Sequence, residues 1–346
     1  MRNPLLEPFD LAPFSKLETA HFKPAFETSL EKARTEIDSI IKNPNPPTFD
    51  NTIAALDYAG YELERIASIF FNLNSAETNP EIQKLAQEIS PMLAAFANDI
   101  TLNEPLFKRV QTVYETAENT ALSEEEQMLL TRKYRNFQRN GALLSDSAKE
   151  KLREIDKALS KLKLTFGDHV LAETQKFKLH LTDPDALSGL PESAREGARA
   201  LAEAQGLEGW VFTLDYPSYL PFMKYADKRE LRKKMAIAFG SRAFHSDALD
   251  NQEVLKEIAS LRFQRARLLG YKNHAEFVLE ERMAKTPEAV QEFLEDLLAK
   301  ALPAAQRETQ QLKDYARNTD SVETFEKWDS SYYSEKLKKE TFDLEE

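Results

Sequence analysis

Glycine is scarce in this sequence. Only 9 of its 346 residues are glycine, whereas the average usage in proteins is about 7%. Sheet-rich folds and phosphate-cradling loops both consume glycine, so its scarcity favours helices. Hydrophobic residues make up 42% of the chain, which is ample for a core. The composition therefore predicts a folded, mostly α-helical protein.

Apolar residues recur at helical spacing through much of the first part of the chain. This spacing predicts helices over residues 22–41, 53–73, 82–97 and 106–114. We find no repeat of 20–50 residues with matching positions, which argues against a helical solenoid. We also find no Gly/Ser/Pro-rich linker that would divide the chain.

Three sequence patterns mark further helix starts. Residues 123–126 and 227–230 have the form of capping boxes, in which two side chains satisfy backbone amides that would otherwise lack partners. Thr286 places a capping hydroxyl before Pro287, at the first helical position. That helix is expected to reach about Arg317, with a kink or break at Pro303.

One segment near the middle of the chain departs from helical spacing. Residues 176–182 alternate polar and apolar side chains, and residues 210–214 are rich in strand-forming types. Between them lie turn residues and a short helical stretch at 192–204. We therefore expect a small antiparallel β ribbon on an otherwise helical body.

Composition also excludes several classes of function. The net charge of −12 disfavours nucleic-acid binding, which needs a cationic face. The absence of cysteine excludes disulfides, thiolate catalysis and cysteine-ligated metal sites. The N-terminal residues lack the apolar stretch of a signal peptide, and no apolar run approaches the roughly 20 residues that span a bilayer. We expect a cytoplasmic protein without a membrane partner.

The histidines and carboxylates offer no metal or catalytic motif. No two of the five histidines are three or four positions apart, so no helix can present two imidazoles to one metal. The acid–imidazole pairs Asp168–His169 and His245–Asp247 are interpreted as surface or capping contacts rather than catalytic pairs. The sequence therefore predicts no catalytic, cofactor-binding or metal-binding residue in this chain. The histidines are His21, His169, His180, His245 and His274.

Two further clusters have a structural interpretation beside a functional one. Five basic residues between 228 and 234 could bind a polyanion, but a solvated helix face with Glu230 as its acidic partner is the preferred interpretation. Tyr216 and Tyr219 could line a peptide channel, or their rings could pack the ribbon onto the helix that starts near 227. Packing is preferred, and the prolines at 217 and 221 predict that helix begins only after 221. The basic residues are Lys228, Arg229, Arg232, Lys233 and Lys234.

The stretch LDYPSYLPFMKYADKRELRKKM at 214–235 resembles zinc metallopeptidases grouped around thimet oligopeptidase, oligopeptidase A and bacterial peptidyl-dipeptidase (dipeptidyl carboxypeptidase). Other stretches resemble the same family in the same order, and the peptidyl-dipeptidase branch is the most similar. These stretches are PTFDNTI at 47–53, IFFNLNSAET at 69–78, SLRFQRARLLGY at 260–271, RMAKTPEAV at 282–290 and WDSSYYSEKL at 328–337.

The resemblance implies the N-terminal helical half of a two-lobed peptidase, forming one wall of a channel that admits short unstructured peptides. Within it we expect a helical region at 1–175, a ribbon and turn region at 176–226, and a second helical region at 227–346. The family holds zinc with an H-E-x-x-H helix, and no H-E-x-x-H occurs in these 346 residues. The resemblance therefore implies a chain that is inactive alone, with zinc and catalysis supplied by a missing C-terminal half.

Two alternatives remain open from the sequence. The chain could be a free-standing helical module that binds peptides or a protein without cutting them. It could also be a structural or interaction protein that shares the scaffold and uses an outer face.

Overall fold

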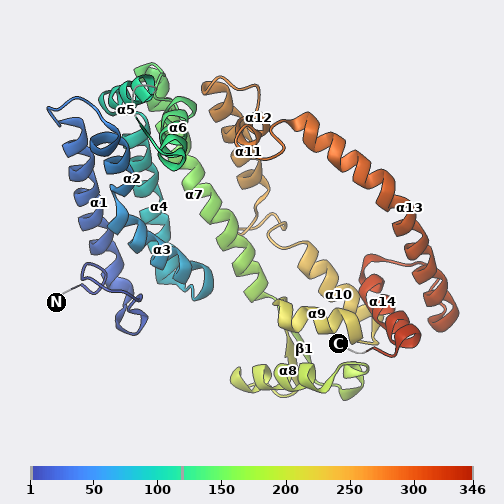
Figure 1. The fold of residues 1–346 in the computed structure, drawn as a ribbon. Coiled ribbons are helices and arrows are strands. Elements are labelled where there is room, and N and C mark those ends of the chain that lie inside the picture. Colours follow the sequence, from blue (N-terminus) through green and yellow to red (C-terminus); the bar gives the residue numbers. More distant parts are fainter. Residues whose placement is uncertain (1–2, 118–120, 345–346) are drawn as a thin grey trace. The chain divides into compact units, whose positions relative to one another are not determined.

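The computed structural model describes residues 3–117 and 121–344 and is mostly α-helical with a two-stranded sheet, as the composition predicted. Figure 1 shows the order of the elements along the chain. The contacts group into two compact units that are interleaved in sequence. Unit 1 contains the residues up to Thr165 together with Glu257–Phe277, and unit 2 contains Phe166–Lys256 together with the residues from Val278 onward.

Unit 1 is a bundle in which α1 packs against α3, α4 and α5. Its core is aromatic: the ring of Phe70 lies 5.1 Å from that of Phe22 and 5.6 Å from that of Phe26. The three rings are at most 2% exposed, so this cluster fixes α3 against α1. The helices are α1 (Thr19–Ile41), α2 (Ala55–Tyr58), α3 (Tyr61–Ala76), α4 (Pro80–Thr101), α5 (Glu104–Thr116) and α6 (Glu124–Arg139).

The helix predicted over 53–73 is wrong as a single element. A π-helical turn (Phe49–Ala54) leads into the short α2, and α3 begins only after a break at Gly60. Gly60 has φ of 81°, in the left-handed region where glycine is favoured. Its N–H donates to the Glu36 carboxylate at 2.8 Å, so α1 holds the break in place.

The capping box predicted at 123–126 is confirmed. Ser123 Oγ accepts from the Glu126 N–H at 3.3 Å, and the Glu126 carboxylate accepts from the Ser123 N–H at 2.8 Å. The long helix α7 (Asp146–Lys176) then carries the chain from unit 1 into unit 2.

Unit 2 contains the predicted ribbon, in which β1 (Leu179–Leu181) pairs antiparallel with β2 (Trp210–Phe212) and Leu179 faces Phe212. α8 (Glu192–Ala204) packs on β2, with the bounds that the sequence predicted. The ribbon shares an apolar core with the next two helices, which contribute Phe222 and Met235. The helices that follow along the chain are α9 (Tyr216–Tyr225), α10 (Arg229–Gly240), α11 (Gln252–Leu268), α12 (His274–Leu279), α13 (Pro287–Asp320) and α14 (Lys327–Phe342). Most of α11 and α12 belongs to unit 1.

Two predictions near the ribbon are wrong. Helix begins at Tyr216, not after Pro221, because Pro217 occupies the first turn, where its missing N–H costs nothing. The expected capping box at 227–230 does not form. α10 starts at Arg229 without a side-chain cap, and the carboxylate of Asp227 accepts from the hydroxyls of Ser188 and Tyr332 instead, each at 2.7 Å.

α13 begins as predicted and continues further than predicted. Thr286 Oγ1 accepts from the Ala289 N–H at 3.1 Å, which confirms the cap. The helix then runs through Pro303 without a break and ends at Asp320. None of the helices in the described residues has the length and apolar character needed to cross a membrane.

Candidate functional site

The stretch 214–235 and the stretch 328–337 meet in unit 2 around a buried ion pair. Asp329 on α14 is fully buried, and Arg232 on α10 is 1% exposed. Arg232 Nη2 donates to Asp329 Oδ1 at 3.1 Å, and Arg229 donates to both carboxylate oxygens, at 2.9 and 2.7 Å. We call Arg229, Arg232 and Asp329 the arginine clamp. It joins two segments almost 100 residues apart in the chain.

Backbone groups complete the arginine clamp. Arg232 also donates to the carbonyl oxygens of Trp328, Ala226 and Asp227, and its guanidinium lies 3.8 Å from the centre of the Tyr332 ring. Burial alone would raise the pKa of Asp329, but the hydrogen bonds and positive charge of Arg229, with Arg232, hold that pKa below its usual range. Asp329 is therefore held as a carboxylate, and the arrangement is structural.

The prediction of a single solvated basic face is therefore wrong for Arg232. Lys228 and Lys234 are exposed, as that prediction required, but Arg232 is in the core of unit 2. This difference could not be predicted, because the acidic partner Asp329 is on α14.

Tyr216 and Tyr219 differ in their environments. The Tyr219 ring stacks on Phe239 of α10, with centres 4.2 Å apart and an interplanar angle of 17°, so the preferred packing interpretation is confirmed for it. Burial raises the pKa of the Tyr219 phenol. Tyr216 is 64% exposed, and its ring makes an edge contact with the same ring at 5.9 Å.

Four of the histidines contact four different partners. His21 accepts from the Glu18 N–H within an N-terminal capping box, and His180 contacts the Glu208 carbonyl beside the ribbon. His169 pairs with Asn251 at 3.0 Å, and His245 lies 3.3 Å from the Glu173 carboxylate. Among the described residues, no three His, Asp or Glu side chains converge as zinc would require. These residues do not fit zinc, and we derive no metal-dependent step from them.

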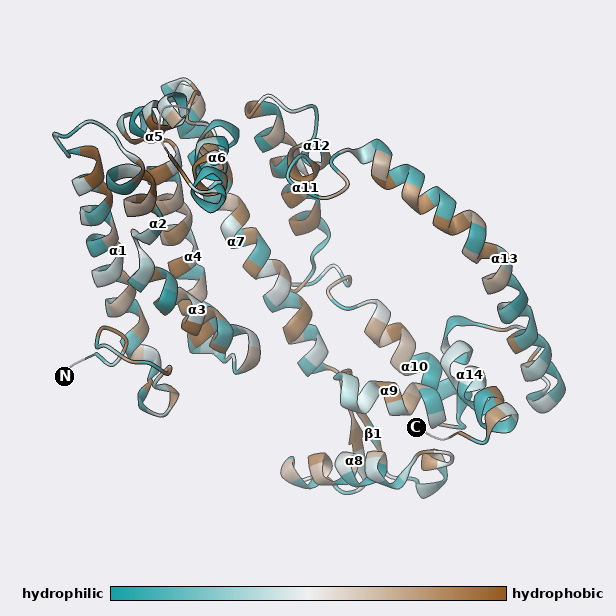
Figure 2. Ribbon diagram, viewed as in Figure 1, coloured by the Kyte–Doolittle hydropathy of each residue, from teal (hydrophilic) through white to brown (hydrophobic). Residues whose placement is uncertain are grey.

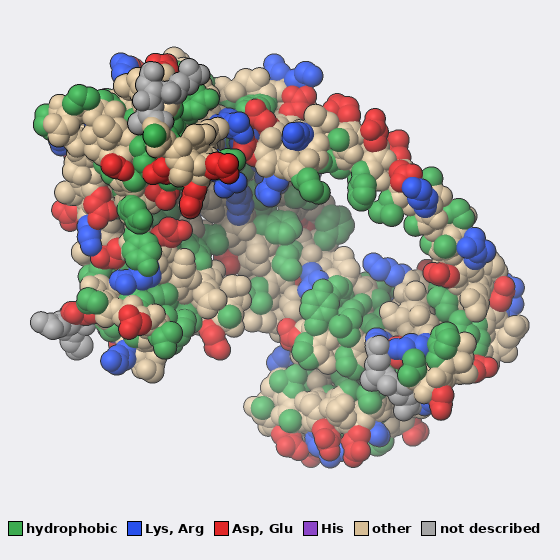
Figure 3. Space-filling view, viewed as in Figure 1, with side chains coloured by type: hydrophobic (Ala, Val, Ile, Leu, Met, Phe, Trp, Pro, Cys, Tyr) green, Lys and Arg blue, Asp and Glu red, His purple; other side chains and the backbone are tan. Residues whose placement is uncertain are grey.

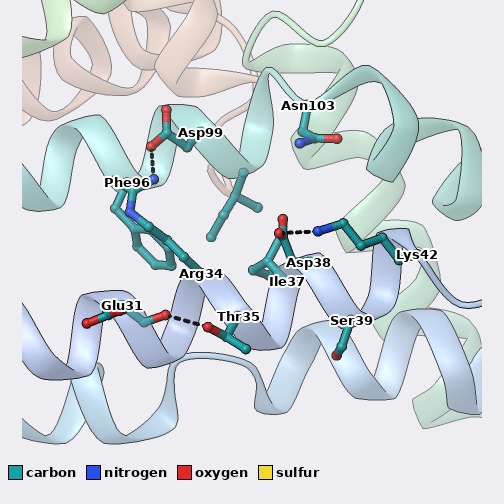
Figure 4. Close-up of a pocket in the computed structure, with 11 residues that line it drawn as sticks. Glu31, Arg34, Thr35, Ile37, Asp38, Ser39, Lys42, Phe96, Asp99 and Asn103 are labelled. Carbon is teal, nitrogen blue, oxygen red and sulfur yellow. Dashed lines mark hydrogen bonds and ion pairs between the residues drawn. The ribbon is translucent and has the colours of Figure 1, made fainter.

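A surface pocket of about 580 Å³ lies between α1 and α4 of unit 1. Figure 4 shows that four of its charged side chains form ion pairs: Arg34 with Asp99, and Lys42 with Asp38 at 2.7 Å. Both cations that line this pocket are therefore engaged by carboxylates of the same pocket. A second cavity in unit 1, beside His274, has unmatched positive charge.

α13 carries a stripe of exposed apolar side chains, which we call the α13 stripe. Their spacing of three and four residues places them along one face of the helix. Figure 2 shows apolar and polar segments alternating along α13, and Figure 3 shows hydrophobic side chains along its edge. An apolar face of this kind marks an interaction surface. The exposed fractions are 66% for Phe293, 51% for Leu294 and Leu297, 57% for Leu298 and 44% for Leu302.

Sequence reasoning missed the α13 stripe and the His274 cavity. The helix itself was predicted from its cap at Thr286 and Pro287, and its apolar spacing was not considered. Nothing in one sequence shows whether such a face is covered. The cavity is lined by residues from five helices, so no local sequence motif predicts it.

Comparisons with known proteins find relatives along nearly the whole chain. Residues 222–346 match the model of peptidase family M3. The chain is 34% identical to oligopeptidase A of Escherichia coli (strain K12) over 99% of its own length and 51% of that protein. It is 33% identical to the dipeptidyl carboxypeptidase of the same organism, over 97% of its length and 50% of that protein. An organellar oligopeptidase A of Arabidopsis thaliana is 31% identical over 99% of the chain and 44% of that protein.

The chain thus spans about half the length of the curated relatives that it matches. The predicted family resemblance is confirmed. The two bacterial enzymes match at nearly equal identity, so the preference for the peptidyl-dipeptidase branch stays a prediction.

Proposed function

We propose that this chain, whose resemblance to the M3 oligopeptidases extends over 99% of its residues, is the N-terminal, non-catalytic half of a zinc-dependent oligopeptidase. In this proposal the parent enzyme is cytoplasmic and cleaves short unstructured peptides, releasing C-terminal dipeptides. This chain supplies one wall of the substrate channel. The zinc and the groups that activate water belong to the other half.

One observation carries the proposal. Nearly every residue of the chain aligns with an oligopeptidase, yet the alignment takes up only 51% of that enzyme. The zinc-binding H-E-x-x-H that the family resemblance implies is not among the 346 residues. A scaffold half without the metal-binding motif accounts for both facts.

The α13 stripe supports the same proposal. Leu297 and Phe293 are more than half exposed on a helix whose opposite face is polar. Burying apolar area is worth about 25 cal/mol per Å², so a surface of this kind favours association with a partner. In the proposal, the partner is the catalytic half.

Two measurements on the purified chain test the proposal. We expect no stoichiometric zinc by elemental analysis and no hydrolysis of short peptides. Metal-dependent cleavage by the pure chain would contradict the assignment of catalysis to another half. The mass of the native protein in its source cells separates the alternatives. A value near twice 39.6 kDa supports the half-enzyme, whereas 39.6 kDa supports a free-standing binding module.

The partner surface is tested with a matched pair of variants on α13. We expect the isolated chain to self-associate in size-exclusion chromatography with light scattering, and Leu297→Gln to reduce this association. Ala299→Gln introduces the same side chain at an exposed position outside the stripe and should leave association unchanged. A concentration-independent monomer before any substitution would argue against the stripe as an interface.

A further inference from the structure

The cavity beside His274 lies entirely within unit 1 and has a volume of about 560 Å³. Its walls come from α4, α6, α11 and α12 and from the part of α7 that belongs to unit 1. Three cationic side chains line it, Lys163, Arg262 and Arg265, against a single carboxylate, Asp156. The cavity therefore has an excess of positive charge, although the whole chain has a net charge of −12.

The carboxylate of Asp156 already forms an ion pair with Arg265. Arg265 Nε donates to Asp156 Oδ1 at 2.7 Å, and both side chains are 17% exposed. Within the part of the chain that the structure describes, Lys163 and Arg262 have no ion-pair partner. Two cations at one cavity without a matching carboxylate repel each other, and an anion bound between them would relieve that repulsion.

Two neutral polar side chains also line the cavity. Asn98 is 6% exposed. Within residues 3–117 and 121–344, the Nδ1 atom of His274 is buried without a hydrogen-bond partner. Leaving a buried polar atom without a partner is unfavourable. An amide and an imidazole can each donate to an oxygen atom, so a bound oxyanion would satisfy them.

We propose that this cavity binds a small, multiply charged oxyanion, with Arg262 and Lys163 as its charged ligands and Asn98 and His274 as hydrogen-bond donors. Phosphate and carboxylate oxygens share the required chemistry, because both accept charge-assisted hydrogen bonds from guanidinium and ammonium groups. The volume accommodates a molecule larger than a single phosphate. The proposal does not depend on the peptidase assignment.

The protonation of His274 should be coupled to binding. Burial lowers the pKa of the His274 imidazole, and the positive charges of Arg262, Arg265 and Lys163 lower it further. An anion at the cavity offsets those charges, so it raises this pKa. By linkage, binding then tightens as the pH falls through the pKa of the bound form. The charged groups around the ring are Asp156 and Lys163 on α7, Arg262 and Arg265 on α11, and Arg139 of α6, whose guanidinium lies over Phe277. The residues of α4 that line the cavity, which include Asn98 and Thr101, are uncharged.

Calorimetric titration of the chain with inorganic pyrophosphate and with citrate tests the proposal. Arg262→Gln should weaken binding about tenfold, the equivalent of about 1.4 kcal/mol, and Lys163→Gln should also weaken it. The matched controls are Arg267→Gln on α11 and Lys161→Gln on α7, which change the net charge equally at exposed positions outside the cavity. Binding of pyrophosphate alone would identify a phosphate site, and binding of citrate alone a carboxylate site; either supports the proposal.

A second readout separates binding from folding. In a histidine-selective NMR titration, the bound anion should raise the pKa of His274, while the resonances of His21 stay in place. Without the anion, Arg262→Gln should unfold at a urea concentration no lower than Arg267→Gln, because it removes the repulsion between Arg262 and Lys163. The proposal is overturned if neither anion binds at low ionic strength, or if the control variants weaken binding as much as the cavity variants.

Discussion

Replacement of Asp329 by asparagine tests whether the arginine clamp holds unit 2 together. The substitution keeps the shape of the side chain and removes its charge. Removing one partner of a buried ion pair costs about 3–5 kcal/mol, because the other charge is left buried. Arg232 would keep three backbone carbonyl acceptors and its position over the Tyr332 ring, and the more exposed Arg229 would gain water. We therefore expect a loss of about 3 kcal/mol, at the lower end of that range.

The assay is urea unfolding followed by tryptophan fluorescence. The chain has two tryptophans, Trp210 and Trp328, and both are in unit 2, so the signal reports the unit that contains the clamp. The control is Asp296→Asn, which breaks an exposed pair with Lys300 on α13 whose side chains are 63% and 73% exposed. We expect the control to lose about 0.3–0.5 kcal/mol. A loss for Asp329→Asn no larger than that of the control would refute the clamp as a source of stability.

Three further predictions use the same assay. The pKa of Asp329 is lowered in the folded state. The charged carboxylate therefore stabilises the fold fully above the ordinary aspartate pKa of about 3.9, and this stabilisation is lost as the pH falls through the pKa of the folded state. The difference in unfolding free energy between wild type and Asp329→Asn should therefore narrow in acid. Gly189 has φ of 83°, and a Cβ there would collide with the Tyr225 carbonyl, so Gly189→Ala should destabilise the fold. Gly197 lies inside α8, and a Cβ there meets nothing within 4 Å. Gly197→Ala should therefore stabilise the fold by about 0.5–1 kcal/mol. Tyr219→Phe should leave stability nearly unchanged, because the ring makes the contact, while Tyr219→Ala should cost about 3 kcal/mol; equal losses would contradict the packing role.

Local signals in the sequence were sufficient for the elements that depend on neighbouring residues. The caps at Ser123 and Thr286 involve groups within three residues of each other, and the ribbon followed from side-chain alternation. The break at Gly60 was missed because a single glycine is tolerated within a helical pattern. Its left-handed conformation depends on Glu36, which lies on another helix.

Features that depend on distant residues could not be predicted. Arg232 is one of five basic residues in a short stretch, and its burial depends on Asp329, 97 positions away. The cavity beside His274 likewise needs the packing of several helices before its unmatched charge is visible. In both cases the sequence shows a charged side chain, but it does not show which distant residue that side chain contacts in the fold.

The arginine clamp also bears on the proposed function, because it continues into α13. Tyr333, four residues after Asp329, donates to the carboxylate of Asp320, the last residue of α13, at 3.0 Å, and Ala316 is fully buried beside it. The C-terminal end of α13 is therefore fixed to α14, and α14 is fixed to α10 by the clamp. The stripe from Phe293 to Leu302 lies on the exposed part of the same helix. The stretches 214–235 and 328–337 thus fix α14 to α10, and α14 in turn anchors the helix whose apolar face is proposed to contact the catalytic half.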